Sequence, residues 1–153
     1  MSQFTAQQIK KLVLLHPDIV CFGCAADYVG DEWVKKAEQK LGFNLSNSYK
    51  WFIKTYAGGE IGTEEIYSLY GMDFEVVSGG DIIYQHLEGL KHNMTGEKEL
   101  VVSETDFGEV FYFDCSNFID GECPINLRAA SGSHINYAVD FFEFLYKRIH
   151  AHV

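Results

Sequence analysis

The sequence predicts an α+β domain, because apolar residues recur with a helical period at both ends of the chain and with a strand period in the middle. Between residues 64 and 129, apolar and polar residues alternate in several short runs, as they do in half-buried strands. The chain has 153 residues, of which 47% are hydrophobic and 15% aromatic, so it can fold around one core. We therefore expect a single domain over residues 1–153, with a mixed or antiparallel sheet of about four to six strands flanked by N-terminal helices, a mid-chain helix and a C-terminal helix.

The first two helices are bounded by recognisable caps. Thr5 and Gln8 have the spacing of a capping box, and the helix that they start is expected to end before Pro17. A second helix is expected over Asp31 to Leu41, with its first residue as the N-cap and Gly42 as the C-terminal stop. Both segments carry apolar residues three and four apart, so one face of each is expected to pack against the core.

Three further helices are expected, beginning with one that starts after Ser46. Its apolar stripe consists of Tyr49, Phe52, Ile53 and Tyr56. We expect it to end at Gly58 or Gly59, since glycine adopts the left-handed conformation that closes a helix without a steric penalty. The segment Ser78-Gly-Gly-Asp81 is expected to cap a mid-chain helix. A broad aromatic stripe over residues 136–150 predicts a last helix that docks deeply on the core.

The strands are predicted from runs of period two. These runs cover residues 64–70, 99–104, 108–114 and 124–129. In the run 108–114, apolar residues occupy both faces, which predicts a strand covered on each side. The sequence Thr-Asp-Phe-Gly at 105–108 lies between two of these strands and predicts a hairpin turn.

The four cysteines are predicted to be thiols that pack as small hydrophobic residues. Cys21 and Cys24 form a C-x-x-C pair, but a redox pair normally opens a helix after a buried strand, and this segment has the composition of a loop. Cys115 and Cys123 are eight residues apart, which is not the spacing of a zinc knuckle. We therefore expect neither a metal site nor a redox centre.

No motif in the sequence predicts catalysis or a bound cofactor. Neither Gly58-Gly59 nor Gly79-Gly80 fits a P-loop or a dinucleotide-binding fingerprint. Ser131 and His134 lie close together, but they lack the nucleophile elbow of the hydrolases. Apolar runs are far too short for a membrane span, and residues 1–11 lack the pattern of a secretion signal, so we expect a cytoplasmic protein without catalytic, cofactor-binding or metal-binding residues.

The charge of the chain is unevenly distributed. Residues 55–127 contain 15 acidic residues and two lysines, whereas the rest of the chain contains seven acidic and ten basic residues. The net charge is −10, and a general explanation for such a charge is solubility. Solubility does not require segregation, however. A field of this kind repels nucleic acid and anionic membranes and attracts a cationic partner.

Residues 33–70 resemble the opening signature of the SUKH superfamily, the Smi/Knr-type proteins. The shared features are a helix that ends in Leu41-Gly42, a Tyr49-x-x-Phe52 helix, and the stop Ala57-Gly58-Gly59 followed by strands. Ser46 stands where proline is usual in the family, which leaves its role as N-cap intact. The later strands and the terminal aromatic helix are similar in order, so the resemblance covers about residues 30–150.

This resemblance implies a non-enzymatic immunity protein, or antitoxin, that binds and neutralises a cognate polymorphic toxin, expected to be a nuclease domain with a basic surface. It transfers no catalytic residue and locates no interface, so the candidate residues for toxin binding come from the charge distribution alone. They are Glu60, Glu64 and Glu65 after the Gly-Gly stop, and Glu104, Asp106 and Glu109 around the predicted hairpin. No nucleic acid, membrane or cofactor is expected as a partner.

Two other classes of function stay open. The first is a regulatory scaffold that binds a signalling protein, as the resemblance to eukaryotic members implies. The second is a domain that binds or hydrolyses a small molecule in a pocket lined by some of the nine tyrosines and two tryptophans. Such a pocket would carry convergent polar groups, whereas the simpler explanation of the aromatic residues is core packing.

Overall fold

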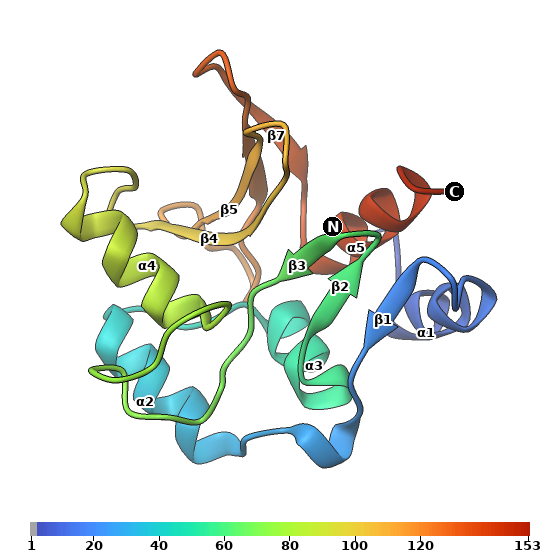
Figure 1. Ribbon diagram of the computed structural model, residues 1–153, viewed down its shortest axis with the longest axis horizontal. Coiled ribbons are helices and arrows are strands. Elements are labelled where there is room, and N and C mark those ends of the chain that lie inside the picture. The colour runs from blue at the N-terminus through green and yellow to red at the C-terminus, as the bar shows by residue number, and fades with distance from the viewer. Residues whose placement is uncertain (1–2) are drawn as a thin grey trace.

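Residues 3–153 are described by a computed structural model, in which five α-helices surround two antiparallel sheets (Figure 1). The helices are α1 (Ala6–Leu15), α2 (Asp31–Leu41), α3 (Asn47–Tyr56), α4 (Ile82–Lys91) and α5 (Phe141–His150), with a short 3-10 helix at Ala25–Asp27. The strands are β1 (Val20–Phe22), β2 (Gly59–Ile61), β3 (Glu64–Ile66), β4 (Glu99–Glu104), β5 (Val110–Asp114), β6 (Ile125–Arg128) and β7 (His134–Ala138). The predicted α+β class is confirmed.

The two sheets are adjacent in space. One has the strand order β1-β2-β3 and the other β4-β5-β6-β7, and all neighbours within each are antiparallel. They are joined where β3 ends, because the Tyr67 N–H donates to the Val102 carbonyl at 2.8 Å and the Ser103 hydroxyl donates to the Glu65 carbonyl at 2.8 Å. The β2–β3 hairpin therefore lies beside β4, as Figure 1 shows.

The core consists largely of aromatic side chains from α3, β5 and α5. The Tyr49 ring lies 5.3 Å from Phe113 and 5.2 Å from Phe141, and Phe141 stacks on Phe144 at 5.2 Å. The buried Tyr49 hydroxyl donates to the Tyr67 carbonyl at 2.7 Å, which satisfies its only donor. This confirms the helical stripe predicted for α3 and the burial of the terminal aromatic helix.

Three of the predicted helix starts are confirmed. Thr5 and Gln8 form the capping box of α1, with hydrogen bonds of 3.3 and 2.9 Å. The Ser46 hydroxyl accepts from the Tyr49 N–H at 3.3 Å, and Asp81 caps α4. The prediction that Asp31 caps α2 is wrong, because the N-cap is Gly30, with φ 104°, and Asp31 is the first helical residue.

The end of α3 differs from the prediction. The residue with left-handed backbone at the C-cap is Ala57, with φ 66°, and its N–H donates to the Ile53 carbonyl at 2.9 Å. The glycines that follow serve another purpose. A Cβ at Gly59 would collide with the Cys21 carbonyl oxygen of β1, so glycine there permits the pairing of β1 with β2.

The last helix is shorter than predicted. It begins at Phe141, with Asp140 as its N-cap, and residues His134–Ala138 form the edge strand β7. The predicted helix start at residue 136 is wrong because β7 pairs with β6, with Leu127 opposite Ile135, and this long-range pairing outweighs the helical pattern of the segment.

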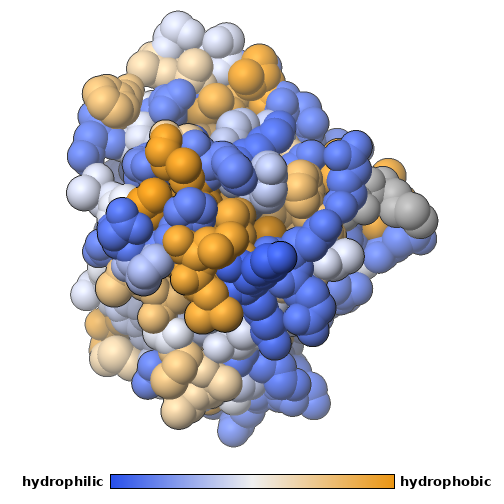
Figure 2. All heavy atoms as spheres, turned by 90° about the vertical axis from the view of Figure 1, so that its right-hand side faces the viewer, coloured by the Kyte–Doolittle hydropathy of each residue, from blue (hydrophilic) through white to orange (hydrophobic). Residues whose placement is uncertain are grey.

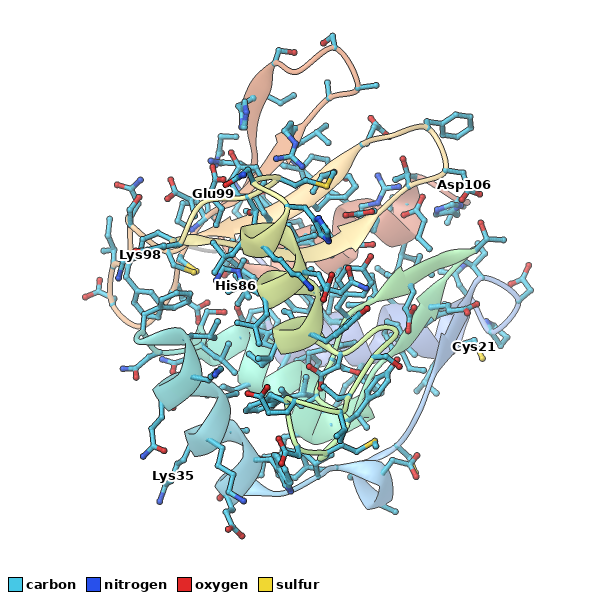
Figure 3. All side chains as sticks on the ribbon, turned by 60° about the vertical axis from the view of Figure 1, so that its left-hand side comes forward. Cys21, Lys35, His86, Lys98, Glu99 and Asp106 are labelled. Atoms are coloured by element: carbon cyan, nitrogen blue, oxygen red, sulfur yellow. The ribbon has the colours of Figure 1, made fainter. Side chains whose placement is uncertain are left out.

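The four cysteines fall into two environments. Cys115 and Cys123 are buried, with their sulfur atoms 3.9 Å apart, so the expectation of packed thiols holds for this pair. It is wrong for Cys21 and Cys24, which are exposed. Figure 3 marks Cys21 on β1, near the outer edge of the three-stranded sheet. None of the helices formed by residues 3–153 is long and apolar enough to span a lipid bilayer.

Candidate protein-binding surface

The acidic residues predicted to bind a partner lie on two neighbouring hairpins, β2–β3 and β4–β5. Glu60 and Glu65 are directly opposite each other in the β2–β3 ladder, and both are exposed. Opposed like charges destabilise a hairpin, and within residues 3–153 neither carboxylate has a salt bridge. From the described residues, the Glu65 carboxylate accepts only one side-chain hydrogen bond, from the Tyr70 hydroxyl at 3.3 Å. The pair therefore presents two uncompensated negative charges.

Glu104 extends this negative surface from the first hairpin to the second. It ends β4 and is exposed, and β4 contacts β3. Burial, together with the charges of Glu104 and Glu65, raises the pKa of Tyr67 to about 12. The Ser103 hydroxyl, next to Glu104 in the chain, donates to the Glu65 carbonyl at 2.8 Å, so Glu65 and Glu104 lie close along the junction between the sheets.

Asp106 and Glu109 lie at the turn of the β4–β5 hairpin. Asp106 is exposed, and the Glu109 carboxylate is half-buried and accepts from the Thr105 hydroxyl at 3.3 Å. The predicted turn is confirmed, with the Gly108 N–H donating to the Thr105 carbonyl at 3.1 Å. Figure 3 shows Asp106 at the outer end of this hairpin, across the sheet from Lys98. We call Glu60, Glu65, Glu104, Asp106 and Glu109 the acidic hairpin surface.

Glu64 is not part of this surface, because basic side chains of the protein itself pair with its carboxylate. The Arg148 guanidinium of α5 contacts both Glu64 carboxylate oxygens at 2.7 Å, and the His152 ring lies 3.1 Å from one of them. The side chains of Glu64 and Arg148 are each only 11% exposed. A cation from the C-terminal helix therefore neutralises this carboxylate inside the protein.

The hairpin turn also exposes an aromatic ring that the charge distribution could not predict. Phe107 lies between Asp106 and Gly108, and 83% of its surface is accessible. The sequence contained a signal, since an apolar residue inside a tight turn has little core to reach. Aromatic side chains are enriched at surfaces that bind proteins.

A second exposed area is apolar and lies on another side of the molecule. Figure 2 faces the side that carries α1 and the C-terminus, and shows hydrophobic residues gathered among hydrophilic ones. Leu14 and Leu15 at the end of α1 are both exposed, as is Val153.

The described residues provide no arrangement that would hold a metal. Within residues 3–153, no three histidine, cysteine or acidic side chains converge closely enough to hold an ion. Most of the tryptophan and tyrosine rings lie in the core or pack against it, as Tyr49, Trp51 and Tyr56 do. This arrangement agrees with the core-packing explanation of the aromatic residues.

The fold and the exposed hairpins are those of a small protein-binding domain. Residues 31–145 match the SUKH_6 family, described as SMI1-KNR4 cell-wall, and the chain belongs to this family. Domains of this family are generally immunity proteins without enzymatic activity, which act by binding another protein. The predicted resemblance to the SUKH superfamily is thereby confirmed, whereas the six residues predicted to bind a toxin stay a prediction.

Proposed function

We propose that this protein is an immunity protein of the cytoplasm that binds and neutralises a cognate polymorphic toxin through its acidic hairpin surface. The observation that supports this most is the group of neighbouring carboxylates on the two hairpins, Glu60, Glu65 and Glu104, which have no basic partner among residues 3–153. Uncompensated like charges destabilise a protein that stands alone. They become favourable when a cationic surface settles against them.

A nuclease is the toxin class that fits this surface best. An enzyme that grips phosphate groups presents lysine and arginine side chains in its cleft. An acidic surface carries the same sign of charge as nucleic acid, so it can bind over that cleft and compete with the nucleic acid substrate. The exposed Phe107 adds apolar contact area beside Asp106, and aromatic side chains often contribute strongly to interface energy.

The neutralisation itself is tested by co-expression. The gene beside that of the immunity protein is expressed in a host cell with and without this chain, and growth and co-purification are measured. We expect the neighbouring product to arrest growth alone, and this chain to restore growth and to co-purify with it. A toxic neighbour that this chain neither binds nor neutralises contradicts the proposal.

The acidic hairpin surface is tested by charge reversal at Glu104 and Asp106. The variants Glu104→Lys and Asp106→Lys each change the net charge by two, and Glu32→Lys on the exposed face of α2 is a control with the same change. We expect the association rate with the toxin to fall about tenfold for the hairpin variants at low salt, and much less for the control. Equal effects of all three substitutions would show that only net charge matters.

A regulatory scaffold is the alternative that the same surface supports, since a signalling protein with a basic patch could bind it. The two functions differ in genomic context and in the phenotype of the partner. A scaffold's partner is not toxic when expressed alone, so the growth measurement above separates the two functions.

A further inference from the structure

A pocket of about 470 Å³ lies between the loop that joins β5 to β6 and the beginning of α5. It is lined by Asn117, Ile119, Asp120, Glu122, Pro124, Val139 and Asp140. Its position is the end of the four-stranded sheet opposite the β4–β5 turn, because Glu99 pairs with Asp114 at that end. None of the charge-based candidates lies in it. We call it the loop pocket.

The outer wall of the loop pocket is a rigid turn. Ile119 and Glu122 exchange two backbone hydrogen bonds, of 2.7 and 3.0 Å, around Asp120 and Gly121, whose φ angles are 53° and 79°. An Asp-Gly pair with two positive φ angles is the preferred two-residue hairpin turn. The Gly121 carbonyl accepts from the Asn47 N–H at 2.9 Å, which ties the turn to α3. Ile119 is held in place and is still 70% exposed.

The inner part of the pocket contains two carboxylates close to each other. Both oxygens of Glu122 accept hydrogen bonds from Ser48, at 2.6 and 2.9 Å. Asp140 is 5% exposed and accepts from the Glu143 N–H through one oxygen, while its other oxygen has no hydrogen bond within residues 3–153. Burial, together with the nearby charge of Asp140, raises the pKa of Glu122. The two carboxylates therefore lie near each other, since the Ser48 hydroxyl that donates to Glu122 also accepts from the N–H of Phe141, the residue after Asp140.

No cation of the protein compensates these charges at the pocket. The lining contains no lysine or arginine in the described part of the chain. The walls beside the carboxylates are apolar, formed by Ile119, Pro124 and Val139, the last of which is 43% exposed. A ligand that fits must combine a positive head with an aliphatic body. A bare metal ion does not fit, since residues 3–153 provide no group of three ligands.

We propose that the loop pocket binds an arginine side chain from the surface of the partner protein. A guanidinium group offers paired N–H donors to the free oxygen of Asp140 and to the carboxylate of Asp120 at the rim, and its three methylene groups contact Ile119 and Val139. An arginine side chain that fills a partly enclosed pocket of its binding partner often contributes a large share of the binding energy. The inference rests on the proposed function, in that the partner is the same toxin.

The loop pocket and the acidic hairpin surface then have separate roles in one association. The exposed hairpin carboxylates attract the partner over a distance and set the association rate. The arginine in the loop pocket loses its water and slows dissociation. Glu104, Asp106 and Glu109 lie at the opposite end of the four-stranded sheet from the loop pocket, so these residues and the pocket can be changed separately.

The pocket is tested first without a partner, by titrating N-acetyl-L-arginine amide into the protein labelled at isoleucine and valine methyl groups. The neutral probe N-acetyl-L-citrulline amide has nearly the same shape and serves as the control. We expect saturable NMR shifts at Ile119 and Val139 with the arginine probe, and about tenfold weaker binding with citrulline, because a hydrogen bond to a charged group is lost. Equal binding of both probes, or no saturable shift at these methyl groups, overturns the proposal.

A matched pair of variants makes the test specific for the pocket. Asp140→Asn removes the charge but keeps a good N-cap for α5, and Glu32→Gln removes a charge from the exposed face of α2. We expect about tenfold weaker arginine binding in the first variant and no change in the second. Unchanged binding in Asp140→Asn overturns the proposal. If the arginine amide binds as expected but the chain fails to neutralise the product of the neighbouring gene, the proposed function is contradicted while the arginine-binding pocket is supported.

Discussion

The two ends of the four-stranded sheet use acidic residues in opposite ways. At the β4–β5 turn, Glu104 and Asp106 project into solvent, where a charge costs little and its field extends outwards. At the other end, Glu122 and Asp140 are largely enclosed and hold two segments of the chain together. The same type of side chain is thus open to solvent at one end and supports the architecture at the other. Burial and hydrogen bonding make the difference.

The hydrogen bonds of the enclosed end connect distant parts of the sequence. Glu122 accepts from the Ser48 backbone and hydroxyl, and the same hydroxyl oxygen accepts from the Phe141 N–H at 3.0 Å. The starts of α3 and α5 and the β5–β6 loop therefore meet at one serine. Side-chain bonds at the hairpin turn, such as that between Thr105 and Glu109, join residues only four apart. The enclosed end is thus expected to be the more sensitive to substitution.

The largest effect on stability is expected at Glu64, the hairpin residue whose carboxylate is paired with a cation and almost fully buried. Arg148→Met leaves the Glu64 carboxylate nearly buried without its partner, and we expect a loss of about 3 kcal/mol in the free energy of unfolding. Urea unfolding followed by circular dichroism measures it. Lys36→Met removes an exposed pair with Glu32 and is the control, with an expected change within about 0.5 kcal/mol. Similar losses in the two variants would contradict the contrast between sealed and open carboxylates.

A smaller effect is expected from removing the carboxylate that anchors the β5–β6 loop. Glu122→Ala leaves the Ser48 N–H and hydroxyl without their acceptor, so we expect a loss of about 2 kcal/mol in the same measurement. Asp106→Ala at the open end is the comparison, with an expected change within about 0.5 kcal/mol. If the two alanine variants are equally stable, the two ends do not differ as described.

The raised pKa of Glu122 predicts the direction in which the stability of the protein changes with pH. Burial raises its pKa in the folded protein, so the folded state binds more protons than the unfolded state between the two pKa values. The stability that Glu122 contributes is present below its unfolded pKa and decreases as the pH rises through the folded value. We expect the wild type's advantage over Glu122→Gln to shrink as the pH rises above about 4, where an unperturbed glutamate loses its proton, and unfolding curves at several pH values measure it. An advantage that grows with pH contradicts the assignment.

Local hydrogen bonds explain what could be predicted of the fold. The starts of α1, α3 and α4 were predictable at Thr5, Ser46 and Asp81, because each cap side chain bonds to an N–H two or three residues away. The run 99–104 is β4 to the residue, and the turn that follows it was predictable from its Thr-Asp-Phe-Gly sequence. The motifs within residues 33–70 likewise indicated the family, whose model matches residues 31–145.

The errors occurred where a distant segment determines the local conformation. β7 is a strand because β6 pairs with it. Ala57 takes the left-handed conformation that closes α3, and the glycine two residues later leaves room for β1. The same reason applies to the candidate residues. Glu64 differs from Glu65 only in which partner it meets, since Arg148 is 84 positions further along the chain.

The sequence by itself determined the class of fold, the caps of three helices, the hairpin turn and the excess of negative charge in the middle of the chain, because these depend on composition and on contacts between near neighbours. Only the tertiary structure decided which carboxylates stay open to a partner and which are sealed, and it alone brought Ile119 and Asp140 to one pocket. The physical reason is that the charge of a carboxylate is fixed by its chemistry, whereas its solvation depends on what the folded chain places around it.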